Sequence, residues 1–272
     1  MKYLKLSGKI VLYFMVYVLT SFICSFAYAL VYSLMNIGNI NQSDLNALVL
    51  KNQYLIGAVA AIITLGTYVL IFRKKEMNLF QKCKVKKLSL KNSSIIILSS
   101  IGLSLFSYSL VNLLISKFPS YNETSNAIAS NASSVLGAIS IVLIAPIFEE
   151  VLLRGLIYNE LKKHLNIIIA IIIQGILFAI AHGNMLQGIY TFIMGIVLAI
   201  IYDKTQSILA PILFHIMYNL LGSILEPIIL NSIGGYYISV LVLGSIILIL
   251  SLVLLFKNNT NVPMSDTLAA EL

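Results

Sequence analysis

The chain has 272 residues, of which 59% are hydrophobic and only 10% are charged. A soluble domain is closer to half apolar and a quarter charged, so this composition excludes an ordinary soluble protein and predicts a polytopic membrane protein. The net charge of +8 would fit a nucleic-acid-binding protein, but the sequence carries no nucleic-acid-binding motif and we expect no nucleic-acid partner.

The first apolar segment follows a lysine-bearing N-terminal stretch. Lys2, Lys5 and Lys9 precede an apolar run from Ile10 to Met35, and the tripeptide 27-AYA-29 resembles the cleavage site of a secretory signal peptide. The run is longer than the apolar core of a typical signal peptide. We therefore interpret it as a first transmembrane helix that is retained.

Seven further apolar stretches follow, and we expect an all-α membrane protein of about eight transmembrane helices with its active site inside the helix bundle. The fifth to seventh are short and are joined by the tight connections 183-GNMLQ-187 and 203-DKTQS-207. The predicted helices span residues 10–35, 54–72, 94–116, 135–158, 166–182, 188–202, 208–225 and 236–256.

The chain divides into three predicted parts. Residues 1–134 would hold the N-terminal transmembrane helices and a basic cytoplasmic loop, and residues 135–225 a catalytic helical core. Residues 226–272 would form the last transmembrane helix and a cytoplasmic tail.

The loops show a strong asymmetry in positive charge. Fifteen of the 18 Lys and Arg residues fall in alternate connections on one predicted side, while only Lys51 and Lys117 fall on the other. Because cytoplasmic loops are rich in Lys and Arg, both termini are predicted to be cytoplasmic in a multi-pass protein of the cell membrane. The basic loop 73–91 is expected to lie against anionic lipid headgroups.

Three ionisable residues interrupt the fourth predicted helix, in 148-FEEVLLRGLIY-158. Charged groups near the centre of a bilayer are costly and usually functional. Glu150 and Arg154 are four residues apart on one helix face and can form an ion pair, whereas Glu149 points about 100° away and needs another partner or a proton. Pro146 leaves a carbonyl of the preceding turn without its usual donor, which favours a kink or a water pocket.

Two histidines also lie in or beside apolar helices. His182 ends 176-ILFAIAHG-183, and His215 stands with Asn219 in 213-LFHIMYNL-220, where the i, i+4 spacing places both on one face. His164 sits beside two lysines in a loop and is interpreted as a solvated residue. A histidine in a membrane helix can simply bond a neighbouring helix, but two of them with Asn219 and Glu149 favour a functional site.

These motifs carry a family resemblance. EEVLLRG resembles the motif EExxxR, FAIAH resembles FxxxH, and HIMYN resembles HxxxN. In this order on successive helices, from about Leu143 to Leu220, they resemble the CPBP family of intramembrane proteases, which includes CAAX proteases and bacteriocin-processing enzymes and is also called Abi. Many members carry Phe where Leu153 stands, and we interpret this difference as a change in packing.

The resemblance implies an intramembrane peptidase. Glu149 and His182 would activate a water molecule, and His215 and Asn219 would stabilise the oxyanion. Glu150 and Arg154 would hold the helix in place without contacting the substrate. An apolar site and neutral donors suit both tasks. The implied substrate is a membrane-associated peptide or a lipidated protein. Prenylated tails are the eukaryotic case, and bacterial relatives are linked to the processing of peptides and to immunity.

Three alternatives remain open. A non-catalytic immunity or scaffolding protein could bind a peptide in the same fold, although it would not require both histidines and Glu149. A transporter could use the buried charges as an ion path, but no inverted repeat is visible.

A zinc-dependent form of the protease is the third alternative. Glu149, His182 and His215 have the ligand composition of a thermolysin-like site. The sequence has no HExxH motif, each candidate ligand lies on a different helix, and Cys24 and Cys83 have no zinc-like spacing and are expected to be unpaired thiols. We therefore expect neither a metal nor another cofactor.

Overall fold

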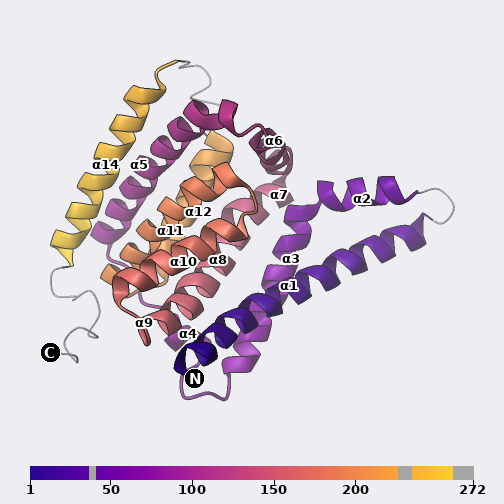
Figure 1. Ribbon diagram of the computed structural model, residues 1–272, viewed down its shortest axis with the longest axis horizontal. Helices are drawn as coiled ribbons and strands as arrows, with labels where there is room; N and C mark the ends of the chain where they lie inside the picture. The colour runs from indigo at the N-terminus through magenta and orange to yellow at the C-terminus, as the bar shows by residue number, and fades with distance from the viewer. Residues whose placement is uncertain (37–40, 226–234, 260–272) are drawn as a thin grey trace.

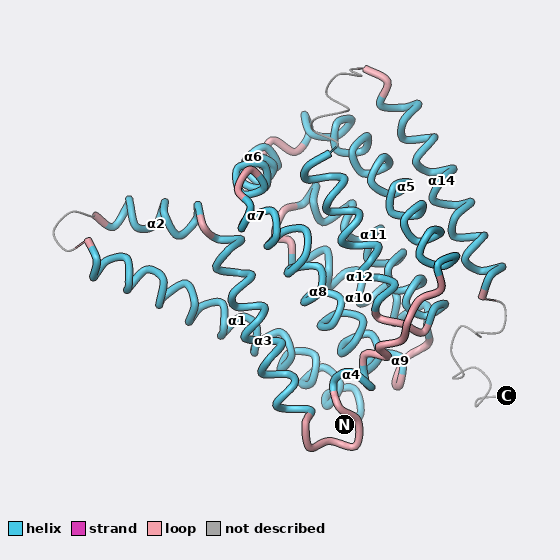
Figure 2. Tube along the Cα trace, turned by 180° about the vertical axis from the view of Figure 1, so that it is seen from behind, coloured by secondary structure: helices cyan, strands magenta, loops and turns pink. Residues whose placement is uncertain are grey.

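The computed structural model describes residues 1–36, 41–225 and 235–259, and within these residues the protein is entirely helical (Figure 2). The longer helices are α1 (Lys2–Met35), α3 (Gln53–Phe72), α5 (Leu90–Leu114), α10 (Ile167–Ala181), α11 (Met185–Thr205), α12 (Leu209–Leu220) and α14 (Tyr237–Asn258). The shorter ones are α2 (Gln42–Lys51), α4 (Leu79–Lys82), α6 (Tyr121–Ala132), α7 (Val135–Ile139), α8 (Ala145–Glu150) and α9 (Asn159–Lys162).

Three helical stretches include segments of different helical pitch. The stretch Val135–Lys162 is one continuous helix that passes through two π-helical segments, η2 (Ser140–Ile144) and η3 (Val151–Tyr158). A third π-helical segment, η4 (Leu221–Leu225), continues α12, and a 3₁₀ turn, η1 (Ile115–Lys117), continues α5. The sequence analysis did not predict the π-helical segments.

Six helices among the described residues are long and apolar enough to span a membrane, which confirms a helical membrane protein. They are Lys2–Met35, Gln53–Phe72, Leu90–Lys117, Val135–Lys162, Met185–Thr205 and Tyr237–Asn258. The fifth and seventh predicted spans correspond to the shorter apolar helices Ile167–Ala181 and Leu209–Leu225. At 1.5 Å per residue, 15 residues rise only about 22 Å, less than the hydrocarbon thickness of about 30 Å. Crossing by these two helices therefore stays a prediction.

Other details differ from the sequence-based expectation. The sixth span is longer than predicted, because Asn184 caps α11 at its start and 203-DKT-205 remains helical. Two polar helices, α2 and α6, had been expected as loops. Of the predicted last part, residues 226–234 and 260–272 lie outside the described residues.

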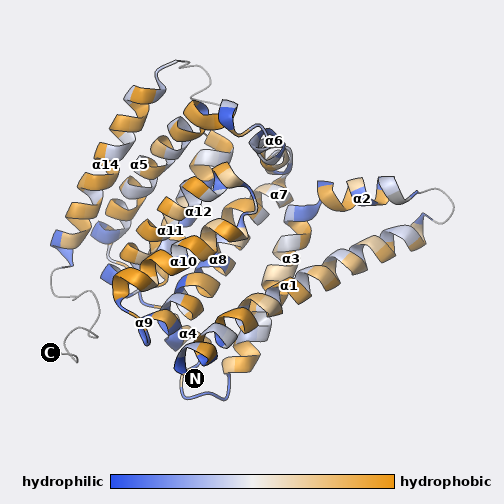
Figure 3. Cartoon of the chain, in the orientation of Figure 1, coloured by the Kyte–Doolittle hydropathy of each residue, from blue (hydrophilic) through white to orange (hydrophobic). Residues whose placement is uncertain are grey.

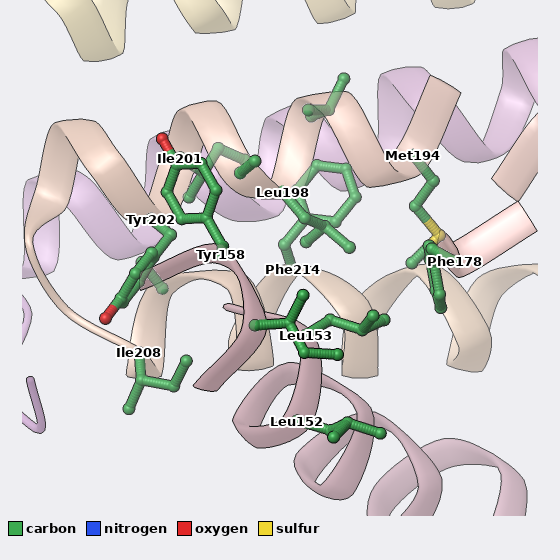
Figure 4. Packing of buried hydrophobic residues seen from close by; sticks show 14 of the residues in the cluster. Leu152, Leu153, Tyr158, Phe178, Met194, Leu198, Ile201, Tyr202, Ile208 and Phe214 are labelled. Atoms are coloured by element: carbon green, nitrogen blue, oxygen red, sulfur yellow. The ribbon is translucent and has the colours of Figure 1, made fainter. Parts of the chain in front are cut away.

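The core of the protein lies between Val135–Lys162, α10, α11 and α12 (Figure 1). Leu152, Leu153, Phe178, Met194 and Phe214 belong to this core cluster, and all five side chains are buried (Figure 4). Leu153 is thus a packing residue, as its position before Arg154 had suggested.

The basic loops meet at one end of the bundle, which we call the basic end. The buried Glu160 carboxylate accepts hydrogen bonds from Lys9, Lys82 and Lys163, and the buried Asp203 accepts one from Lys162. The N-terminus, α4 and α9 lie together at this end, whereas α6 and α7 lie at the opposite end, and Figure 3 shows the polar residues gathered near α4 and α9 (Figures 1 and 3).

Candidate active site

Glu149 and Glu150 are adjacent but occupy different environments. The Glu149 side chain is 29% exposed and lines a cavity, whereas the Glu150 side chain is 0% exposed. This separation agrees with the angle of about 100° between neighbouring residues of a helix. Only Glu149 of the two is available to a molecule in the cavity.

Glu150 joins two helices through one oxygen atom. Its Oε1 accepts a hydrogen bond from Nη1 of Arg154 at 2.9 Å and lies 2.8 Å from Nδ1 of His215. The ion pair between Glu150 and Arg154 is therefore present, and both side chains are fully buried. The contact with His215 was not predicted, because residues 65 positions apart give no local signal.

Arg154 is held by further contacts with α10 and α11. Its Nη2 donates to the Gly195 carbonyl at 3.2 Å, and its guanidinium lies 4.8 Å from the centre of the Phe178 ring. Gln174 Nε2 donates to the same Gly195 carbonyl at 2.7 Å. An ideal Cβ at Gly195 would lie 2.9 Å from the Cα of Gly175, so only a glycine permits this approach of the two helices.

Gln174 and Gly195 were missed by the sequence analysis. A signal for Gln174 exists, because it is the one polar side chain in the apolar run 167-IIIAIIIQGILFAIA-181. Polar side chains in such helices commonly bond across helices, which is what Gln174 does.

His182 lies at the end of α10. Gly183 follows it with a φ of 69°, a conformation that favours glycine, and the Asn184 side chain then accepts from the backbone N–H groups of Leu186 and Gln187. The His182 Nδ1 is 2.8 Å from the Phe178 carbonyl oxygen. Because a carbonyl only accepts, Nδ1 carries the proton, and Nε2 of the neutral ring has a free lone pair.

His215 lies between the two glutamates. With Nδ1 on Glu150, its Nε2 is 3.7 Å from Oε2 of Glu149. The Phe178 ring contacts both His182 and His215 edge-on, with ring centres 4.8 and 5.8 Å apart. Phe178 therefore fixes the orientation of both histidines.

Asn219 satisfies a backbone group that the π-helical segment leaves free. The Ala145 N–H donates to the Ser140 carbonyl, five residues back, and Pro146 has no N–H to offer to Ile141. The Asn219 Nδ2 donates to the Ile141 carbonyl at 2.9 Å instead. The sequence analysis predicted that Pro146 would leave a carbonyl without its donor. That carbonyl is that of Ile141, and it positions Asn219.

These side chains share one cavity of about 710 Å³. Glu149, His182, His215 and Asn219 all line it, and Glu150 and Arg154 do not. Its volume is in the range of cavities that bind small molecules or short peptide segments. The four predicted catalytic residues therefore line one cavity. The two predicted supporting residues are buried in the helix packing outside its lining.

Metal-binding groups of three or more His, Cys, Asp or Glu side chains are absent from the described part of the chain. Cys24 and Cys83 are free thiols, as expected. Cys83 lies in the connection before α5, where burial raises the pKa of its thiol to about 12. This thiol is therefore protonated at neutral pH and is a poor nucleophile.

Comparison with known proteins identifies the segment that carries the site. Residues 131–221 match the family model described as Rce1-like, type II CAAX prenyl endopeptidase. This match contains Glu149, His182, His215 and Asn219, but not the cavity residues that come from α1, α3 and α5. No curated protein and no solved structure matches the chain.

Proposed function

We propose that the protein is an intramembrane endopeptidase of the CAAX protease family, because residues 131–221 match the Rce1-like family model. It would hydrolyse a peptide bond of a membrane-associated or lipidated substrate. The observation that carries the proposal is the cavity in which Glu149, His182, His215 and Asn219 meet.

Glu149 and His182 are proposed to activate the attacking water. Among the described residues that line the cavity, Glu149 is the only carboxylate, and Nε2 of His182 is free to accept a proton because Nδ1 donates to the Phe178 carbonyl. The activated water adds to the scissile carbonyl carbon as the base takes its proton. The carbon–nitrogen bond then breaks, and that proton passes to the released amine.

His215 and Asn219 are proposed to stabilise the oxyanion. One N–H of Asn219 is used on the Ile141 carbonyl, and its second N–H remains for a substrate oxygen. Because Nδ1 of His215 donates to Glu150, Nε2 donates only when the ring carries both protons, so the proposal requires that form in the transition state. Such donors typically contribute about 3–4 kcal/mol each.

Glu150 and Arg154 are proposed as positioning residues. Glu150 fixes the imidazole of His215 through Nδ1, and Arg154 fixes Glu150 while bonding the Gly195 carbonyl of α11. The same arrangement holds a histidine in one orientation in many hydrolases, where a buried carboxylate bonds the nitrogen remote from the substrate.

Comparison of membrane peptidomes tests the proposal. Cells carrying the wild-type protein should release peptides that are missing from cells carrying Glu149→Gln, at equal amounts of membrane-inserted protein. Identical peptidomes would favour the alternative of a protein that binds a peptide without cutting it.

The basic loop 73–91 is proposed to dock on anionic lipids at the cytoplasmic face of the cell membrane. Its exposed cations alternate with exposed Met77, Phe80, Val85 and Leu90, which could enter the interface while the cations bind headgroups. Replacement of Lys74, Lys75, Lys86 and Lys87 by Gln should reduce the phosphatidylserine retained per protein in native mass spectrometry. Replacement of Lys51 and Lys117 by Gln is the control and should leave it unchanged.

A further inference from the structure

The cavity occupies the half of the bundle that is remote from the basic end. Four helices that reach the basic end with one terminus, α3, α5, α10 and α11, line the cavity with residues near their other terminus, while α1 contributes only Tyr17, near its middle. The helix α10, for example, starts near the basic end and lines the cavity with Phe178, Ala181 and His182. Comparable lining residues are Gln53, Tyr54 and Gly57 of α3, Tyr108, Val111 and Asn112 of α5, and Gln187, Tyr190 and Thr191 of α11.

The polar helix α6 lies across this remote end (Figure 1). Tyr121, Ser125, Ile128 and Ala129 recur at helical spacing, and all four line the cavity. The Tyr121 hydroxyl lies 3.3 Å from the hydroxyl of Tyr190 on α11. The cavity therefore lies nearer the end at which α6 lies than the end that carries the basic loops.

The lining is polar and contains no cation other than its two histidines. Six tyrosines and five serines face the cavity, together with the Glu149 carboxylate, and no Lys or Arg lines it among the described residues. A free carboxylate placed beside Glu149 would find only His182 and His215 as possible cationic partners, and the proposed chemistry uses both, so its burial would be unfavourable. The lining suits the uncharged amide groups of a peptide segment better than the carboxylate end of a chain.

We propose that the substrate of this site is an internal peptide segment presented on the extracytoplasmic side of the membrane. The inference rests on the proposed function and on the predicted orientation, in which the fifteen cations of the basic loops lie in the cytoplasm. A cytoplasmic prenylated tail would approach from the basic end and would bring its terminal carboxylate into a cavity without Lys or Arg. Hydroxyl and amide groups of the lining would bond the backbone of the segment on either side of the cleaved bond.

The location is tested by labelling single cysteines in intact cells with a membrane-impermeant maleimide. Cys24→Ser is required as a background, while Cys83 can remain because it is buried and its pKa is about 12. Asn126→Cys, on the exposed face of α6, should be labelled from outside, and Lys75→Cys only after permeabilisation. The reverse pattern would overturn the proposal.

The substrate class is tested with right-side-out spheroplasts and inside-out vesicles from the same cells. The probe is a pool of randomised synthetic dodecapeptides, half with a terminal amide and half with a carboxylate, plus a peptide ending in S-farnesylcysteine and three residues. Cleavage that Glu149→Gln abolishes should be at least tenfold greater in spheroplasts, and amides should be cut at least as fast as carboxylates.

Two results separate this inference from the proposed function. Glu149-dependent cleavage found mainly in inside-out vesicles, or confined to carboxylate-ended or farnesylated peptides, would overturn the inference and support the proposed peptidase. Absence of Glu149-dependent cleavage in both preparations would contradict the peptidase itself, and the maleimide labelling would still decide which side of the membrane the α6 end faces.

Discussion

At the scale of single residues, the site depends on one oxygen atom of Glu150, which bonds both Arg154 and His215. The i, i+4 spacing made the first contact predictable from the sequence. The second joins residues on helices far apart in the chain, and only the packing of α12 against α8 creates it. A residue predicted to support the helix thus also orients His215, the histidine that we propose as an oxyanion donor.

Arg154→Ala is expected to lower the yield of folded protein, because it strands the Glu150 carboxylate in a fully buried place. Removal of one partner of a buried pair typically costs about 3–5 kcal/mol. The double variant Glu150→Ala, Arg154→Ala should recover much of the yield but not the activity, since His215 then lacks its partner. Size-exclusion chromatography of a fluorescent fusion measures the yield, and a double variant no better than Arg154→Ala would show that the pair is not formed.

Asn219→Leu should lower kcat by about 10²–10³ and leave KM nearly unchanged, because oxyanion contacts strengthen in the transition state. The replacement also removes the donor to the Ile141 carbonyl, so thermal stability must be measured in parallel. Asn219→Ser, a smaller donor, should keep more activity than Asn219→Leu. A rise in KM with normal kcat would indicate peptide binding and not an oxyanion role.

The zinc alternative makes a different prediction for the same residues. Glu149 and His215 are close, with 3.7 Å between Oε2 and Nε2, and His182 has a free Nε2. We expect the purified active protein to contain well under one zinc per chain by atomic emission and to keep its activity in tight zinc chelators. Stoichiometric zinc, together with activity that is lost on chelation and restored by zinc, would show that these three residues are zinc ligands.

At the scale of helices, the sequence predicted most of the elements and missed those that shape the site. Apolar length and flanking charge located the six long helices and the two short ones. The polar helix α6 lacks an apolar run, and the segment Ser140–Ile144 gives no local sign of π-helical pitch apart from the nearby Pro146. These features follow from tertiary packing and from the loss of one backbone donor, so apolar periodicity could not reveal them.

The helices α5 and α14 approach each other closely at Gly102 and Gly244. An ideal Cβ at Gly102 would lie 2.6 Å from the Leu248 backbone nitrogen, which cannot move aside. Gly102→Ala should therefore lower the melting temperature, at a cost of about 1–3 kcal/mol. The control is Gly66→Ala, which meets no atom within 4 Å and should leave the melting temperature within error. Equal melting temperatures for both variants would contradict the close packing of α14.

At the scale of the whole molecule, the charge asymmetry of the loops has a structural counterpart. The sequence predicted that Lys9, Lys82 and Lys163 lie on the same side of the membrane. It did not predict that all three bond the buried Glu160, because Lys9 and Lys82 are 151 and 78 residues from it in the chain, and only Lys163 is a neighbour, at i, i+3. Gathering these loops around Glu160 gives the bundle two unlike ends, with the cavity nearer the end that carries few cations.

The central claim is that Glu149 is the carboxylate that activates water in this cavity. It is tested most directly by the turnover of purified Glu149→Gln, an isosteric change, on a peptide that the wild type cleaves. The control is Glu123→Gln on the exposed face of α6, and melting temperatures of all three proteins should agree. We predict a loss of at least about 10³-fold in kcat for Glu149→Gln and no loss for the control. Turnover of Glu149→Gln within tenfold of the wild type would contradict the claim.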